Sequence, residues 1–136
     1  MITVHSSDIT TPLDLAKSIV RILQDKKARN IKLLFVEEQT VLTSYFVICE
    51  GRSSTQIRAL ADELDDVIGK AGLAPLHKDG LQSGSWTVLD FGSVIVHLFD
   101  RQTREFYNLE KLWGDATAVD ISDNLDDSEK ADTSEE

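Results

Sequence analysis

Two short apolar runs constrain the fold of this chain more than any other feature of its sequence. Residues 31–36 and residues 44–49 are rich in β-branched and aromatic side chains, and neither run alternates apolar with polar positions. Such residues favour strands, and a strand that is apolar on both faces must be covered on both faces. The two runs therefore predict central strands of a β-sheet that has helices packed against it.

The segments that flank these runs have the period of helices. In the first helix, Thr11 can cap the N-terminus and Asn30 can close the C-terminus. Its apolar face comprises Leu15, Ile19, Ile22 and Leu23. The second helix begins at Ser53 or Ser54 and is ended by Gly72. Its apolar face comprises Ile57, Leu60, Ala61, Leu64, Val67 and Ile68.

A β-hairpin is predicted by two further apolar runs that surround a short turn. Its strands are residues 86–90 and 94–99. If Phe91 and Gly92 occupy the turn, Trp86 lies opposite His97. Phenylalanine is poorly suited to a positive φ, so a register that is shifted by one residue stays open.

Smaller elements complete the predicted fold. Residues 73–77 predict a short strand and residues 78–85 a polar loop, both before the hairpin. After the hairpin, Asp100 and Asn108 can each cap a short helix, and Gly114 can end the second one. The element order is α-β-β-α-β-β-β-α, which predicts the α/β class with a mixed β-sheet flanked by helices.

Most of the negative charge lies at the C-terminal end. The 136 residues include 14 Lys+Arg and 24 Asp+Glu, so the net charge is −10. Residues 115–136 contain nine acids and one base, a charge of −8, which leaves only −2 for residues 1–114. We therefore expect one domain over residues 1–116 and an acidic, disordered tail over residues 117–136. The total charge argues against a protein that coats an RNA backbone or an anionic membrane, and it favours a basic partner.

No targeting or membrane-spanning segment is predicted. The N-terminal region lacks a basic start followed by an apolar run, and no run reaches the ~18 apolar residues of a membrane span. The single cysteine, Cys49, cannot form an internal disulfide. These features predict a soluble protein of a reducing cytoplasm.

The residues that could carry catalysis or bind a metal do not form a recognisable active site. His5, His77 and His97 have no second ligand at helical spacing, and Cys49 lies in an apolar strand that would disfavour its thiolate. The strand-to-helix turn at residues 51–54 could attract an anion, which leaves a nucleotide-using enzyme as an alternative function. That turn lacks the lysine and spacing of a phosphate-binding loop, so a helix cap is the simpler interpretation. We expect no catalytic residue, cofactor or metal.

Aromatic residues are concentrated near the C-terminal end of the predicted domain. Six of the nine lie between residues 86 and 113: Phe91 of the predicted turn, and Trp86, Phe99, Phe106, Tyr107 and Trp113. We expect Phe99 and Phe106 to belong to the core. For Trp86, Tyr107 and Trp113, core packing and a protein interface both remain open, because Trp and Tyr are prominent in interfaces.

Three motifs resemble those of a known family. Residues 86–99 have the sequence WTVLDFGSVIVHLF, and residues 104–116 have the sequence REFYNLEKLWGDA. Both closely resemble the C-terminal signature of the ribosomal silencing factors, the RsfS or Iojap family. Residues 45–53, YFVICEGRS, together with Gln56, resemble the second-strand and helix-start motif of the same family. The resemblance covers residues 12–116.

The resemblance implies a fold and a function. It implies a fold related to nucleotidyltransferases without their catalytic acids, and a protein that is often a homodimer when free. It also implies binding to the large ribosomal subunit through its fourteenth protein, which would block joining of the small subunit and lower translation when nutrients are scarce. The residues that match the motif and are expected to contribute to the partner surface are Trp86, Asp90, His97, Arg104, Tyr107, Leu109, Glu110 and Trp113.

The chain departs from the family pattern at three places. Ser44 stands where the family commonly has Asp, and Glu50 stands where Thr is usual. Lys78, Asp79 and Gly80 replace a more typical Glu-Gly pair. The resemblance therefore assigns no binding role to the acidic position that Ser44 replaces.

Overall fold

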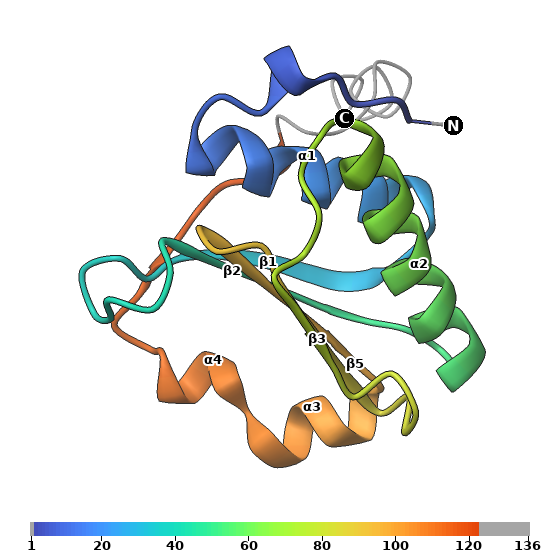
Figure 1. Cartoon of the computed structure of the whole chain (residues 1–136). Helices are drawn as coiled ribbons and strands as arrows, with labels where there is room; N and C mark the ends of the chain where they lie inside the picture. Colours follow the sequence, from blue (N-terminus) through green and yellow to red (C-terminus); the bar gives the residue numbers. More distant parts are fainter. Residues whose placement is uncertain (1, 123–136) are drawn as a thin grey trace, which may run out of the picture.

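The computed structural model describes residues 2–122, in which one six-stranded sheet lies between two layers of helices (Figure 1). The elements in chain order are a 3₁₀ turn η1 (Ser6–Asp8), α1 (Pro12–Asp25), β1 (Arg29–Phe35), β2 (Tyr45–Glu50), α2 (Ser54–Lys70), β3 (His77–Asp79), β4 (Trp86–Asp90), β5 (Val94–Phe99), α3 (Arg101–Tyr107), α4 (Leu109–Leu112) and β6 (Thr117–Ala118). The strand order across the sheet is β3-β4-β5-β2-β1-β6. The predicted α/β class with a mixed sheet is confirmed.

The sheet is mixed because β2 and β5 are parallel while the other neighbouring strands are antiparallel. These two strands are the central ones, and five of the six residues of β2 are buried. The prediction of a central position is therefore confirmed for β2. It is wrong for β1, which lies next to the edge, because only the two-residue strand β6 covers its outer side.

The two faces of the sheet are covered to different extents. Helices α1 and α2 pack on the first face and enclose the larger core, which includes Val47 and Leu98 (Figure 1). Helices α3 and α4 lie on the second face over a smaller cluster, which includes Phe46 and Phe99. Because α3 has seven residues and α4 has four, the second face is only partly covered.

The predicted helix caps are present. Thr11 Oγ1 accepts a hydrogen bond from the Asp14 N–H at 3.1 Å, and Ser53 Oγ accepts one from the Gln56 N–H at 3.1 Å. Asp100 and Asn108 cap α3 and α4 in the same way. The first helix ends at Asp25, earlier than predicted, because the chain turns at Lys27 with φ of 66° and Asn30 already belongs to β1.

The hairpin forms in the register shifted by one residue, the alternative that the sequence leaves open. Trp86 pairs with Phe99, and His97 pairs with Val88. The turn residues are Gly92 and Ser93, since the Phe91 N–H donates to the Val94 carbonyl at 2.9 Å. Gly92 has φ of 88°, and a glycine at the first turn position is typical of the type II′ turns that suit hairpins. Glycine, rather than phenylalanine, therefore takes the positive φ and moves the turn by one residue.

The strand before the hairpin also lies later than predicted. Strand β3 comprises His77–Asp79 instead of residues 73–77, so it includes part of the predicted polar loop. Pro75 has no N–H to donate to a neighbouring strand. Pairing with β4 accordingly starts beyond it, where the Leu76 N–H donates to the Asp90 carbonyl at 2.7 Å.

The sheet continues beyond residue 116, where the sequence predicts the end of the domain. Strand β6 pairs with Leu34 and Phe35 of β1, and the side chains of Val119 and Ile121 pack against the larger core. Residues 117–121 are therefore part of the folded unit, because β6 pairs with the outer side of β1 and the two side chains cover part of the core. The rest of the predicted acidic tail, residues 123–136, lies outside the described residues.

Candidate partner-binding surface

All the predicted site residues lie on the second face of the sheet or on the segment that crosses it. The exposed one is Tyr107, the half-buried ones are Trp86, Asp90, Glu110 and Trp113, and the buried ones are His97, Arg104 and Leu109. The structure thus brings the eight residues into one region. It separates those that a partner could touch from those that lie beneath.

The accessible part of this region is aromatic. We use the name aromatic surface for Trp86, Phe106, Tyr107 and Trp113, which lie on β4, on α3 and directly after α4. The rings of Trp86 and Tyr107 are 4.7 Å apart, and those of Phe106 and Tyr107 are 5.0 Å apart. Phe106 is 80% exposed, so its predicted core position is wrong, because it lies on the solvent side of the short helix α3.

Buried rings support the aromatic surface from below. Phe99 is fully buried, as predicted, and its ring lies 4.9 Å from that of Trp86. The Phe46 ring meets Trp113 at 5.1 Å and His97 at 5.0 Å, both edge to face. Edge-to-face and offset contacts are the favourable geometries for aromatic pairs. A continuous set of ring contacts therefore connects the two tryptophans.

His97 is a buried, hydrogen-bonded histidine that lies beneath the aromatic surface. Its Nδ1 accepts a hydrogen bond from the Trp86 Nε1–H at 3.2 Å, and the residue is 8% exposed. Burial disfavours the charged imidazolium and lowers the pKa of His97 to about 4. At neutral pH the ring is uncharged, as acceptance by Nδ1 requires.

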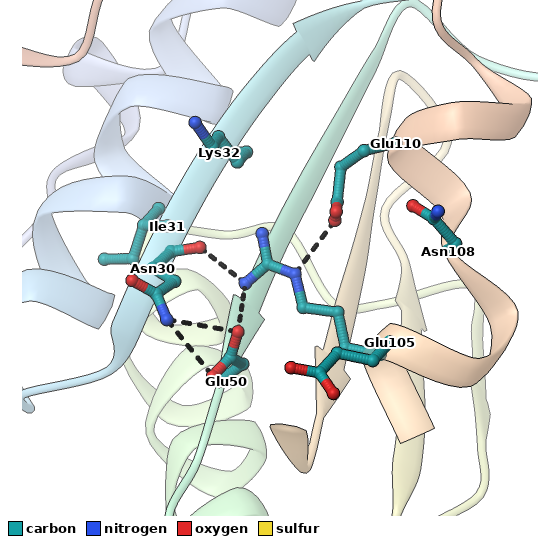
Figure 2. Close-up of a pocket in the computed structure, with 8 residues that line it drawn as sticks. Asn30, Ile31, Lys32, Glu50, Glu105, Asn108 and Glu110 are labelled. Carbon is teal, nitrogen blue, oxygen red and sulfur yellow. Dashed lines mark hydrogen bonds and ion pairs between the residues drawn. The ribbon is translucent and has the colours of Figure 1, made fainter. Parts of the chain in front are cut away.

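Arg104 lies at the centre of a buried polar network rather than on the surface, and its partners Asn30, Glu50 and Glu110 are labelled in Figure 2. Its Nη1 donates to the Asn30 carbonyl at 2.6 Å and to Glu50 Oε2 at 2.9 Å, and its Nε donates to Glu110 Oε1 at 2.9 Å. Asn30 Nδ2 donates to both carboxylate oxygens of Glu50 at 3.2 Å. The network connects α3 and α4 to the ends of β1 and β2, so it fixes the segment that carries the aromatic surface.

Sequence reasoning missed two parts of this region. Glu50 was identified only as a departure from the family pattern, although a carboxylate at the end of an apolar strand signals a buried partner. Leu112, which is 73% exposed on α4, was not singled out. Its side chain is an exposed apolar group on the same short segment that carries Trp113.

A polar cleft of about 550 Å³ adjoins the Arg104 network (Figure 2). Its lining residues are Asn30, Ile31, Lys32, Glu50, Arg104, Glu105, Asn108 and Glu110. Arg104 is already paired with Glu50 and Glu110, and Glu105 is paired with Arg101. Typical small-molecule sites are mostly apolar with a few placed polar groups, and this cleft does not have that character.

The other candidate groups have structural roles. Ser53 caps α2 by accepting from the Gln56 N–H, and the Arg52 N–H donates to Gln56 Oε1 at 2.6 Å, so these two N–H groups are engaged within the chain. Cys49 is fully buried, and burial raises the pKa of its thiol to about 12. Among residues 2–122, no three His, Cys, Asp or Glu side chains are grouped so that they could hold a metal ion. In the same residues, no helix is long and apolar enough to cross a membrane.

Comparison with known proteins agrees with this description. The family model described as "Ribosomal silencing factor during starvation" (RsfS) matches residues 9–136. The ribosomal silencing factor RsfS of Bacillus subtilis is 38% identical over 109 residues, which cover 77% of this chain and 92% of that protein. RsfS of Halalkalibacterium halodurans is 36% identical over 108 residues, covering 79% and 92%. A crystal structure of a Chromobacterium violaceum protein has a TM-score of 0.75 at 30% identity and covers 77% of this chain and 88% of that one.

The fold and the surface together define a mixed α/β domain whose second sheet face presents aromatic side chains on short, firmly attached helices. The family match spans nearly the whole chain, and the relatives are covered over nine-tenths of their length. The chain belongs to the RsfS family of ribosomal silencing factors. The family indicated by the sequence motifs is therefore confirmed.

Proposed function

We propose that this protein lowers translation in the cytoplasm by binding the large ribosomal subunit through its fourteenth protein and by blocking the joining of the small subunit. The observation that carries the proposal is the aromatic surface, whose large rings are accessible and pack on one another above the buried Arg104 and Phe99 side chains. A steric block needs no turnover, only a stable interface. Such interfaces typically bury ~800 Å² on each partner and depend on a few aromatic or arginine anchors.

The contact residues of the proposed interface are the accessible ones. Trp86, Tyr107 and Trp113 are the expected anchors, with Phe106 and Leu112 as additional apolar contacts. His97, Arg104 and Leu109 support the surface from beneath, because each is buried. Asp90 and Glu110 are half-buried.

Charge supports this assignment only weakly. Residues 1–114 carry a net charge of −2, so the folded part of the chain is nearly neutral. Complementary charge mainly accelerates encounter and selects partners. We therefore assign the binding free energy chiefly to apolar contacts on the aromatic surface, and we expect the affinity to depend weakly on salt.

Sedimentation with purified large subunits tests the proposal. The protein should migrate with the large subunit at physiological salt and should reduce the formation of joined ribosomes when small subunits are added. Tyr107→Ala should weaken binding at least tenfold, the order of a lost aromatic anchor, and should lower the melting temperature only slightly because half of the side chain is exposed. Arg21→Ala removes a large exposed side chain from α1, on the opposite side of the sheet, and is the matched control.

Absence of co-migration by the wild-type protein would refute the proposal. If a nucleoside triphosphate with magnesium then raised the melting temperature, a nucleotide-using function would replace it, because a ligand that binds only the folded state stabilises that state. We also propose that the free protein forms a homodimer. Analytical ultracentrifugation of the wild-type chain tests that proposal separately.

A further inference from the structure

His97 has features that core packing alone does not explain. Its ring is parallel to that of Phe99, at 12° and 6.1 Å, and meets the edge of Phe46 at 5.0 Å. A phenylalanine would fill the same position and make similar ring contacts. The histidine also carries a cost, because its buried Nε2 has no hydrogen-bond partner among residues 2–122. The contact that only histidine supplies is the bond from its Nδ1 to Trp86.

That bond determines what Trp86 offers to a partner. Trp86 and His97 are diagonal neighbours on the second face, since Trp86 pairs with Phe99 and His97 with Val88. The indole is held on three sides: by the hydrogen bond at 3.2 Å, by the Phe99 ring at 4.9 Å and by the Tyr107 ring at 4.7 Å. Its only N–H is used within the domain. A partner therefore meets Trp86 as apolar ring surface of fixed orientation.

We propose that His97 is a positioning residue, which acts on partner binding through Trp86 and does not touch the partner. The inference rests on the proposed function, because it assumes that Trp86 is an anchor. Two facts support it. His97 is 8% exposed and so is out of reach of a partner, and the only hydrogen bond of its side chain within residues 2–122 ends on a half-buried ring of the aromatic surface. Anchors that are held in the bound geometry before binding lose less conformational freedom on association.

The neighbouring Tyr107 supplies the polar group that Trp86 lacks. Its side chain is 52% exposed, and its hydroxyl can both donate and accept a hydrogen bond. The partner surface should therefore present an apolar patch to the Trp86 ring and a hydrogen-bonding group next to it for the Tyr107 hydroxyl. The oriented pair, rather than either ring alone, defines the recognised shape.

Two substitutions of His97 separate positioning from packing. His97→Phe keeps an aromatic ring but removes the acceptor. His97→Asn removes the ring but keeps an acceptor on Cγ, where histidine carries Nδ1. Affinity for purified large subunits should fall about five- to tenfold in His97→Phe, the order of one lost hydrogen bond at an anchor, and should be closer to wild type in His97→Asn. Circular dichroism establishes that each variant is folded.

Fluorescence provides a readout that a purely structural role would not change. The chain has two tryptophans, so Trp113→Phe leaves Trp86 as the single reporter. In that background, His97→Phe should lower the anisotropy of Trp86 and shift its emission to longer wavelength. His97→Asn should keep both the anisotropy and the emission wavelength close to those of the Trp113→Phe protein. Two results would overturn the inference. The first is an anisotropy of Trp86 that does not change in His97→Phe. The second is a lower anisotropy together with wild-type affinity of His97→Phe for the large subunit.

The binding assay and the fluorescence assay together distinguish a failure of this inference from a failure of the proposed function. If the wild-type protein fails to bind large subunits, the proposed function fails, and the anisotropy still shows whether His97 holds Trp86. If the wild-type protein binds and His97→Phe binds equally well, the proposed function stands and the positioning role is refuted.

Discussion

Replacing Glu50 with glutamine should remove a large part of the stability of the domain. The side chains of Arg104 and Glu50 are 7% and 9% exposed, and their ion pair is 2.9 Å long. Glutamine has the same shape, so the substitution removes the charge without making a cavity. Breaking a buried pair from one side costs about 3–5 kcal/mol, because the remaining charge stays buried. Glu110 still contacts the Arg104 Nε at 2.9 Å, so we expect a loss of about 3 kcal/mol, the lower end of that range.

Urea unfolding followed by circular dichroism measures this loss directly. Glu105→Gln is the matched control, because Glu105 pairs with Arg101 on the surface, where both side chains are more than half exposed. Exposed pairs typically contribute about 0–1 kcal/mol. The double variant Glu50→Leu with Arg104→Met removes both charges and should be more stable than Glu50→Gln alone. The reasoning is refuted if Glu50→Gln loses no more stability than Glu105→Gln.

Three further predictions follow from the fold. Burial lowers the pKa of His97 to about 4, so between pH 6.5 and 4 the unfolded chain binds a proton that the folded chain does not. The free energy of unfolding should therefore fall by about 3 kcal/mol as the pH is lowered over that range. In His97→Phe, the free energy of unfolding measured with urea should depend less on pH. Gly92→Ala should cost about 1–2 kcal/mol in thermal unfolding, since φ is 88° there, and an unchanged melting temperature would contradict the turn assignment. A chain that ends at residue 116 should be about 2 kcal/mol less stable than one that ends at residue 122. The shorter chain loses β6 and the partly buried side chain of Ile121. Equal melting curves of the two chains would show that residues 117–122 contribute nothing to stability.

The elements that the sequence predicted well are those with local causes. The caps at Thr11 and Ser53 depend on a side chain and an N–H three residues later, so both partners are visible in a few residues of sequence. Helix α2 ends just before Gly72, whose φ is 98°. By contrast, the hairpin turn depends on whether Phe91 or Gly92 takes the positive φ, and the pairing of whole strands settles that question.

The candidate site could be predicted as a region but not as a surface. The motif residues do gather on one face, because alternate residues of β4 and β5 point to the same side of the sheet. Which of them are accessible depends on where α3 crosses that face. Phe106 is exposed, whereas Arg104, two positions earlier and on the other side of α3, is buried against Glu50. Residues so close in sequence have nearly the same composition around them, so no local pattern distinguishes their exposure.

The sequence by itself determined the family, the α/β class, the main helices and the central strand β2, because each of these depends on motifs or on apolar periodicity along a short stretch. Only the tertiary structure decided which aromatic rings face solvent, that Glu50 is the partner of Arg104, and that His97 is bonded to Trp86. Glu50 and Arg104 are separated by 54 positions in the chain. Contacts of this kind arise from the packing of the short helices on the sheet, and packing depends on all the side chains that meet there at once.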